Sequence, residues 1–86
     1  MDDRKIKTLV RREKSFLQAK EELCYINNEL KYFNDKLNNN NLESKDIEYY
    51  NNRVQYFNDL YNYYVNRLEV LQERYTSYKE KYFKEI

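Results

Sequence analysis

Apolar side chains recur along this chain at alternating steps of three and four residues, in two separate stretches. In the first stretch, one column of positions seven residues apart contains Leu9, Phe16, Leu23, Leu30 and Leu37, and a second contains Arg12, Ala19, Ile26 and Phe33. In the second stretch, the columns are Ile47, Val54, Tyr61, Leu68, Tyr75 and Tyr82, and Tyr50, Phe57, Tyr64, Leu71 and Tyr78. These columns correspond to heptad positions a and d, so the pattern predicts two amphipathic helices with coiled-coil-like seams.

The two seams do not join into one continuous heptad pattern. After Leu37 the next a position is Ser44, whereas the second seam is phased on Ile47, and the three-residue slip falls in NNNNLES. Asparagine favours turns, so a break is expected there. We predict an all-α fold in one domain, 1–86, with a helix over about 3–38, an Asn-rich turn over about 38–43 and a helix over about 44–85. Asp2 or Asp3 is expected to cap the first helix, and Ser44 or an asparagine the second.

A short link between two helices predicts an antiparallel hairpin; a long parallel coiled coil is the main structural alternative. Folding about Asn40 pairs Leu9 with Leu71, Phe16 with Tyr64, Ala19 with Tyr61, Leu23 with Phe57, Ile26 with Val54, Leu30 with Tyr50, and Phe33 with Ile47. In this arrangement Glu29 and Arg53 share a flank and are expected to form a weak ion pair. The second helix is expected to overrun the first at the open end, leaving Tyr78, Tyr82, Phe83 and Ile86 partly uncovered.

One phrase occurs twice, 24 residues apart. INNELKYFND (Ile26–Asp35) and YNNRVQYFND (Tyr50–Asp59) match at six of ten positions and have the same heptad phase. This pattern favours duplication of one helical unit, which would give a quasi-symmetric hairpin. The alternative is convergence by composition, because the excess of Asn, Tyr and Lys indicates an AT-rich genome.

Further apolar residues lie outside the two seams. Position c, which points outward from the seam, holds Tyr25, Tyr32, Tyr49, Tyr56, Tyr63 and Val70, and position b of the first helix holds Val10, Leu17 and Cys24. Two helices alone cannot bury these stripes, so the hairpin is expected to complete a helical bundle by self-association or by docking on a partner. The five outer tyrosines are therefore the candidate partner-binding residues. The alternatives are a wet subunit interface, or tyrosines exposed because of coding bias.

The composition limits the chemistry that this chain can perform. It has no Gly, Pro, Trp or His, and its single cysteine, Cys24, suggests a reducing compartment. Without histidine the usual general base is missing, and without glycine there is no phosphate-cradling loop. We therefore expect no enzymatic activity, no metal and no cofactor. No apolar run is long enough to span a membrane and the start MDDRKIK is not a signal peptide, so the expected location is the cytoplasm, or the host cytoplasm if the protein is viral.

Charge suggests a second kind of partner. The chain carries a net charge of only +1, which argues against wholesale phosphate neutralisation. Its first 15 residues are nevertheless basic, with Arg4, Lys5, Lys7, Arg11, Arg12 and Lys14 as possible nucleic-acid contacts. Interleaved acidic residues make a solvated helix surface the simpler interpretation of this end.

These observations lead to two functional hypotheses. The first is a non-catalytic protein–protein interaction module that binds itself or a larger protein, including the case of a phage or mobile-element inhibitor of a host or defence protein. The second is a small nucleic-acid-associated regulator that uses the basic open end of the hairpin.

Overall fold

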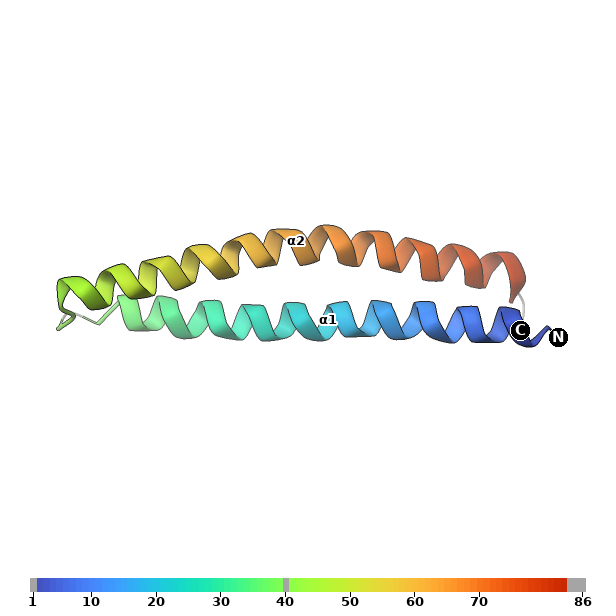
Figure 1. The fold of residues 1–86 in the computed structure, drawn as a ribbon, viewed down its shortest axis with the longest axis horizontal. Coiled ribbons are helices and arrows are strands. Elements are labelled where there is room, and N and C mark those ends of the chain that lie inside the picture. Colours follow the sequence, from blue (N-terminus) through green and yellow to red (C-terminus); the bar gives the residue numbers. More distant parts are fainter. Residues whose placement is uncertain (1, 40, 84–86) are drawn as a thin grey trace.

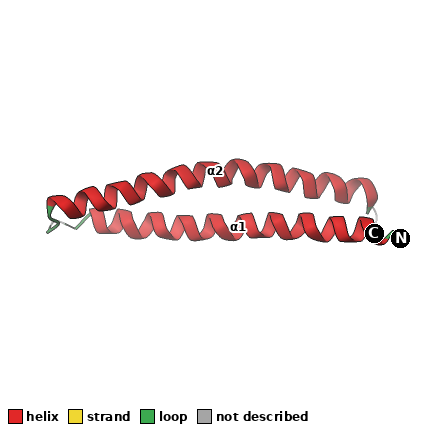
Figure 2. Cartoon of the chain, viewed as in Figure 1, coloured by secondary structure: helices red, strands yellow, loops and turns green. Residues whose placement is uncertain are grey.

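The protein consists of two long helices that lie side by side and run in opposite directions (Figure 1). The computed structural model describes residues 2–39 and 41–83. Helix α1 spans Asp3–Leu37 and helix α2 spans Ser44–Tyr82. The described residues contain no strand (Figure 2). The prediction of an all-α chain with two helices is therefore confirmed. The second helix is predicted to extend to about residue 85, and residues 84 and 85 lie outside the described part.

The molecule is elongated. It measures 62 × 18 × 16 Å and has a radius of gyration of 19.0 Å, whereas a compact domain of this length would have about 12 Å. In the described part, no helix is both long enough and apolar enough to cross a membrane.

The two helices begin differently. The side chain of Asp2 accepts a hydrogen bond from the Arg4 backbone N–H at 2.9 Å, as expected for an N-cap residue. At α2 the N-cap position is held by Glu43, whose side chain makes no capping hydrogen bond. Ser44, expected as a cap, is instead the first helical residue, so that prediction is wrong. Between the helices, the Asn41 backbone N–H donates to the Asn39 side-chain oxygen at 3.0 Å and tightens the turn.

The core is thin and lies along the predicted seam. The five buried hydrophobic side chains of the described part are Ala19, Ile26, Phe33, Phe57 and Leu71, all at predicted d positions. Partly buried seam residues such as Leu30, Val54 and Tyr61 pack against the group formed by Ile26, Phe33 and Phe57. The heptad pattern therefore identified the faces by which the two helices meet.

The predicted pairing of layers is wrong by one heptad. The Phe33 ring lies 5.9 Å from Tyr50 and 6.0 Å from Phe57, which places it level with Val54 rather than Ile47. Near the open end, the Arg12 side chain donates to the Arg74 carbonyl and lies over the Tyr78 ring, so it is level with about Tyr75. Because each helix is continuous, all the other predicted layers shift by the same heptad as the layers of Phe33 and Arg12.

This shift moves the overhang to the other end of the hairpin. With Phe33 level with Val54, Leu37 lies level with Tyr50, and α2 extends about 9 Å beyond α1 at the turn. Figure 1 shows this projection, and Ile47 within it is 42% exposed. At the open end the two helices finish together, where the Lys5 ammonium lies 4.5 Å from the Tyr82 ring centre. The predicted overrun of α2 at that end is therefore wrong, and Ile86 lies outside the described residues.

Candidate functional site

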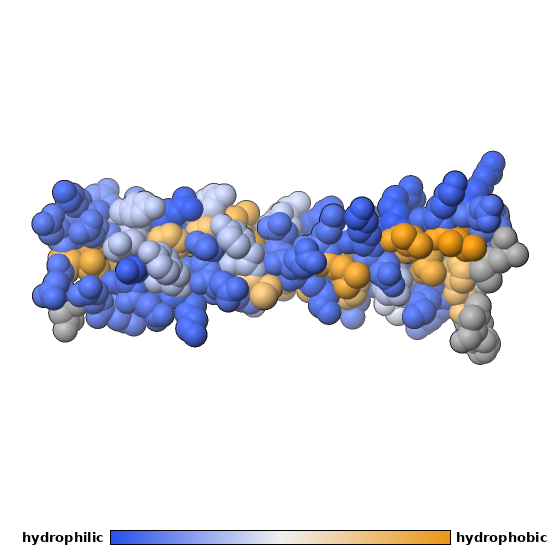
Figure 3. Space-filling view, turned by 90° about the horizontal axis from the view of Figure 1, so that it is seen from below, coloured by the Kyte–Doolittle hydropathy of each residue, from blue (hydrophilic) through white to orange (hydrophobic). Residues whose placement is uncertain are grey.

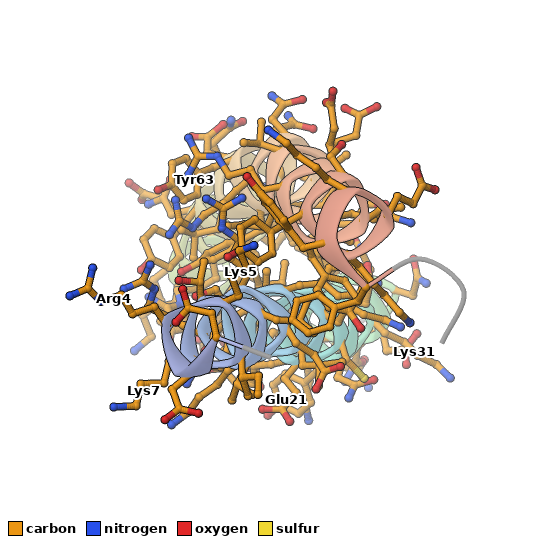
Figure 4. The ribbon with its side chains drawn as sticks, turned by 90° about the vertical axis from the view of Figure 1, so that its right-hand side faces the viewer. Arg4, Lys5, Lys7, Glu21, Lys31 and Tyr63 are labelled. Atoms are coloured by element: carbon orange, nitrogen blue, oxygen red, sulfur yellow. The ribbon has the colours of Figure 1, made fainter. Side chains whose placement is uncertain are left out.

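The expected tyrosines lie on one flank of the hairpin. In an antiparallel pair, positions g and c of both helices face the same side, while positions e and b face the other. Figure 4 shows Tyr63 of α2 and Arg4 of α1 on one side of the molecule and Lys31 on the opposite side. Each of the five tyrosines is exposed by 50–56%. The structure thus brings all five candidate partner-binding residues to a single surface.

These tyrosines do not simply point away from the other helix, as their outward position c suggested. The Tyr25 ring packs edge-on against Phe57 across the helix pair at 6.1 Å, and Tyr49 packs in the same way against Phe33 at 6.3 Å. The phenol side chain is long enough to reach back over the seam, and the two g–c sides lie close together. The tyrosines therefore cover part of the core while they expose the rest of their rings.

The repeated phrase, together with the tyrosine that precedes each copy, forms a nearly two-fold symmetric aromatic cluster. Phe33 and Phe57 occupy equivalent positions in the two copies, and their rings stack at 6.0 Å and 20°. Around them, Tyr25 on Phe57 at 73° mirrors Tyr49 on Phe33 at 75°. The remaining pairs, Tyr32 with Phe33 and Tyr56 with Phe57, both have centroids 5.1 Å apart. The repetition thus has a structural correlate, a six-ring cluster built from matching residues of both helices.

Arg53 lies over this cluster. Its guanidinium carbon is 5.1 Å from the Phe57 ring centre and 5.2 Å from that of Tyr56, within the range of cation–π attraction. Its buried Nε has no hydrogen-bond partner among the described residues. Glu29, the equivalent residue in the first copy, was expected to pair with Arg53. No such ion pair is formed within 4.0 Å in the described part, because the guanidinium lies over the rings instead.

The same flank carries the arginines. All six arginines of the chain lie at positions g or c, or at the adjacent d position in the case of Arg12. We call this surface the arginine–tyrosine flank. It consists of Arg4, Arg11, Arg12, Tyr25 and Tyr32 on α1, and of Tyr49, Arg53, Tyr56, Tyr63, Arg67 and Arg74 on α2. Shallow grooves in its terminal half are lined by Arg11, Arg12 and Arg74, and by Tyr63, Arg67 and Arg74.

The charge of this flank differs from that of the whole molecule. Among the described g and c positions of the helices, seven residues are basic and three are acidic, a net charge of +4. The whole chain has a net charge of +1. The three acidic residues are Glu22, Glu29 and Asp46. Positive charge is therefore collected on one side and balanced by acidic residues elsewhere.

The opposite flank is aliphatic rather than aromatic. Ile6, Val10 and Leu17 of α1 are 40%, 58% and 45% exposed, and Val65 of α2 is 37% exposed. Cys24 continues this row and is also exposed. Figure 3, which views the molecule from the α1 side, shows strongly apolar surface near the terminal end. We call Ile6, Val10, Leu17, Cys24 and Val65 the aliphatic flank. The stripe predicted from position b thus lies on the surface.

The six basic candidates for nucleic-acid contact do not form one surface. Arg4 and Arg11 lie on the arginine–tyrosine flank, whereas Lys7 points outward from α1 in Figure 4 and Lys14 is one heptad further along that side. Lys5 lies at the seam over Tyr82, and Arg12, at the seam edge of the arginine–tyrosine flank, lies over Tyr78. Sequence reasoning missed Arg67, which lines a groove with Tyr63 and Arg74, since its neighbours on α1 depend on how the two helices pair.

Comparisons with known proteins add no assignment to this geometry. No family model, no curated protein and no solved structure gives a significant match to the chain. Within the described residues, no group of three or more histidine, cysteine, aspartate or glutamate side chains is placed to hold a metal ion.

Proposed function

We propose that this protein is a non-catalytic protein–protein interaction module, a helical hairpin that completes a larger helical bundle by self-association or docking. The observation that carries this proposal is the exposed area. The chain exposes 6953 Å², whereas a compact monomer of 10.9 kDa exposes about 5,600 Å². The excess is more than the roughly 800 Å² that each partner buries in a standard interface.

The aliphatic flank is the surface best suited to a second copy. Two identical surfaces meet in a two-fold dimer, so like charges on them repel. The arginine–tyrosine flank would oppose two net charges of +4, whereas Ile6, Val10 and Leu17 are uncharged and adaptable in packing. Two hairpins joined through these residues would form a four-helix bundle with coiled-coil-like seams.

The solution mass tests this proposal. Light scattering across micromolar concentrations is expected to give about twice the mass of 10.9 kDa. Leu17→Lys places a charge in the proposed interface and should return the protein to a monomer. Its matched control is Gln18→Lys, which adds the same charge one residue further on, at the other flank, and should leave the mass unchanged. A helical monomer at every concentration, or equal effects of the two variants, would contradict self-association through the aliphatic flank.

The nucleic-acid-associated regulator remains a second candidate. Arg4 and Arg11 share one flank with tyrosines, a combination that single-stranded nucleic-acid sites also use. Support for it is weaker, because the six basic residues that suggested it are distributed over three sides of the hairpin. Binding of RNA or DNA that weakens steeply with salt would favour it.

A further inference from the structure

The two basic residue types are distributed differently over the hairpin. All six arginines lie on the arginine–tyrosine flank, whereas lysines occur on every side, including Lys20 and Lys31 on the aliphatic side and Lys7 on the outer side of α1. A general need for solubility or positive charge would be met equally well by either type. The segregation therefore points to the specific chemistry of the guanidinium group.

The arginines on this flank are not paired with acids of their own chain. Among the described residues, no carboxylate oxygen lies within 4.0 Å of an arginine nitrogen. Arg11, Arg12 and Arg74 line one groove together with Ser15 and Leu71, and no acidic residue lines it. The Arg12 guanidinium is held in place by its hydrogen bond to the Arg74 carbonyl at 3.3 Å and by the Tyr78 ring. This groove therefore presents three guanidinium groups, of which that of Arg12 is held in place, and no carboxylate beside them.

Arginine and tyrosine together are characteristic of protein interfaces. Arginine and aromatic residues are enriched at interfaces and dominate their binding energy, whereas lysine is depleted there. A guanidinium binds a carboxylate through two parallel hydrogen bonds, which an ammonium group cannot do. Half-exposed tyrosines supply contact area at a low cost in conformational entropy.

We propose that the arginine–tyrosine flank docks an acidic protein surface, with partner carboxylates on Arg11, Arg12 and Arg74 and apolar partner side chains on Tyr25, Tyr56 and Tyr63. The proposal rests on the protein-interaction function proposed above and names the chemistry of one partner. Charge complementarity requires an acidic partner, because the g and c positions on this side have a net charge of +4 while the whole chain has only +1.

The arrangement along the flank favours a protein over a nucleic acid. A single-stranded nucleic acid alternates phosphates and bases, so its sites combine basic and stacking residues along the same track. On this flank the two are separated in part: most tyrosines lie toward the turn and most arginines toward the termini. Arg53 nevertheless lies over Tyr56 and Phe57, and Tyr63 lines a groove with Arg67 and Arg74. A folded acidic surface with an apolar patch beside it fits this separation.

Side-chain NMR on the full chain tests the assignment directly. The arginine Nε–H and backbone amide signals of labelled protein would be followed during titration with a synthetic peptide whose glutamates and phenylalanines alternate at helical spacing. The expected result is saturable shifts of Arg11, Arg12 and Arg74 and of the tyrosine half of the flank. An oligothymidylate of matched charge is the competing probe and should bind more weakly.

Charge-preserving variants separate carboxylate recognition from general attraction. The double variant Arg11→Lys/Arg74→Lys keeps the charge and should weaken peptide binding by about tenfold or more, the loss expected for a charge-assisted hydrogen bond. Both side chains are exposed, so folding should be retained, as circular dichroism would verify. The control Lys20→Gln/Lys31→Gln removes two charges from the other side and should change binding less than about twofold.

Three results would overturn the assignment: no saturable shift on the flank, equal binding by the lysine double variant, or tighter binding of the oligothymidylate. The last result would assign the flank to nucleic acid. A dimer by light scattering combined with any of these results would leave the proposed self-association intact while removing the acidic partner.

Discussion

One hydrogen bond links the side chains of the two helices near the open end. The Tyr75 hydroxyl donates to the Glu13 carboxylate at 2.8 Å, and Tyr75 also stacks on Phe16 at 6.0 Å. The hydrogen bond to Glu13 raises the pKa of the Tyr75 phenol above its usual value of 10.0, and burial and the negative charge of Glu13 act in the same direction. Folding therefore favours the protonated phenol.

This pKa shift predicts a pH-dependent contribution to stability. A raised pKa in the folded state means that the contribution is complete below pH 10 and is lost as pH rises through the folded pKa. Tyr75→Phe should lower the free energy of unfolding by about 0.5–1 kcal/mol at pH 7. Between pH 9 and 11, the free energy of unfolding of this variant, measured by urea unfolding, should fall less steeply with pH than that of the wild type. Parallel curves over that range would show that Tyr75 does not contribute in this way.

Two isoleucines test the pairing of layers. Ile26 is 1% exposed in the core, whereas Ile47 is 42% exposed where α2 projects beyond α1. Ile26→Ala should cost about 3 kcal/mol and Ile47→Ala less than about 1 kcal/mol, as measured by urea unfolding under identical conditions. Similar costs for both would support the pairing of Ile47 with Phe33 that the sequence suggested, and would contradict the structure.

At the scale of the helices, the sequence predicted the faces but not their alignment. The a and d columns identify Ile26, Phe33 and Phe57 as core because burial follows the heptad period. Sliding one helix by seven residues leaves every a position opposite a d position, so the repeat has no unique register. The turn does not remove this ambiguity, because residues 38–43 can span up to about 20 Å when extended. The register therefore follows from the fit of particular rings, such as Phe33 between Tyr50 and Phe57.

The N-terminus of α2 lacks a side-chain cap, so a substitution that supplies one should stabilise the protein. Glu43 has extended backbone angles, φ −80° and ψ 160°, but its side chain does not cap the helix. Glu43→Ser should allow the hydroxyl to accept a backbone N–H and raise the free energy of unfolding by about 0.5–1 kcal/mol. Its lost contact with Lys45, an exposed pair at 3.7 Å, should matter little.

The matched experiment at the other helix is Asp2→Ala. It removes the cap that accepts from the Arg4 N–H and should lower stability by about 1 kcal/mol. Thermal unfolding of both variants beside the wild type gives the comparison. A destabilised Glu43→Ser variant would show that Glu43 contributes to the turn in some way other than capping.

At the scale of the whole molecule, the two flanks could not be derived from either helix alone. Tyr25 and Tyr63 share a surface because the helices are antiparallel; in a parallel pair, the c positions of the two helices would lie on opposite flanks. The proximity of Arg11 and Arg74 depends in addition on the register. The sequence therefore identified the five tyrosines as a candidate site, but it placed the positive charge at one end instead of along one side.

Self-association should also appear in thermal stability. If two hairpins share an interface, the unfolding midpoint rises with protein concentration, because association stabilises the folded state by mass action. We expect a rise of several degrees per tenfold increase in concentration for the wild type. The Leu17→Lys variant should show none. A midpoint that is independent of concentration in both proteins would indicate that each hairpin is stable alone.

The start of α1 and the end of α2 lie together at the open end of the hairpin, where Lys5 lies over Tyr82. This arrangement has a mechanical consequence. A force pulling α1 and α2 apart at that end loads the outermost layer first, then the next, so the layers break in sequence. Each layer contributes only a few side chains, and no step must break the whole seam at once. If the two chain ends were attached to bodies under tension, the helices would separate progressively from the open end at low force. They would pair again when the tension is released.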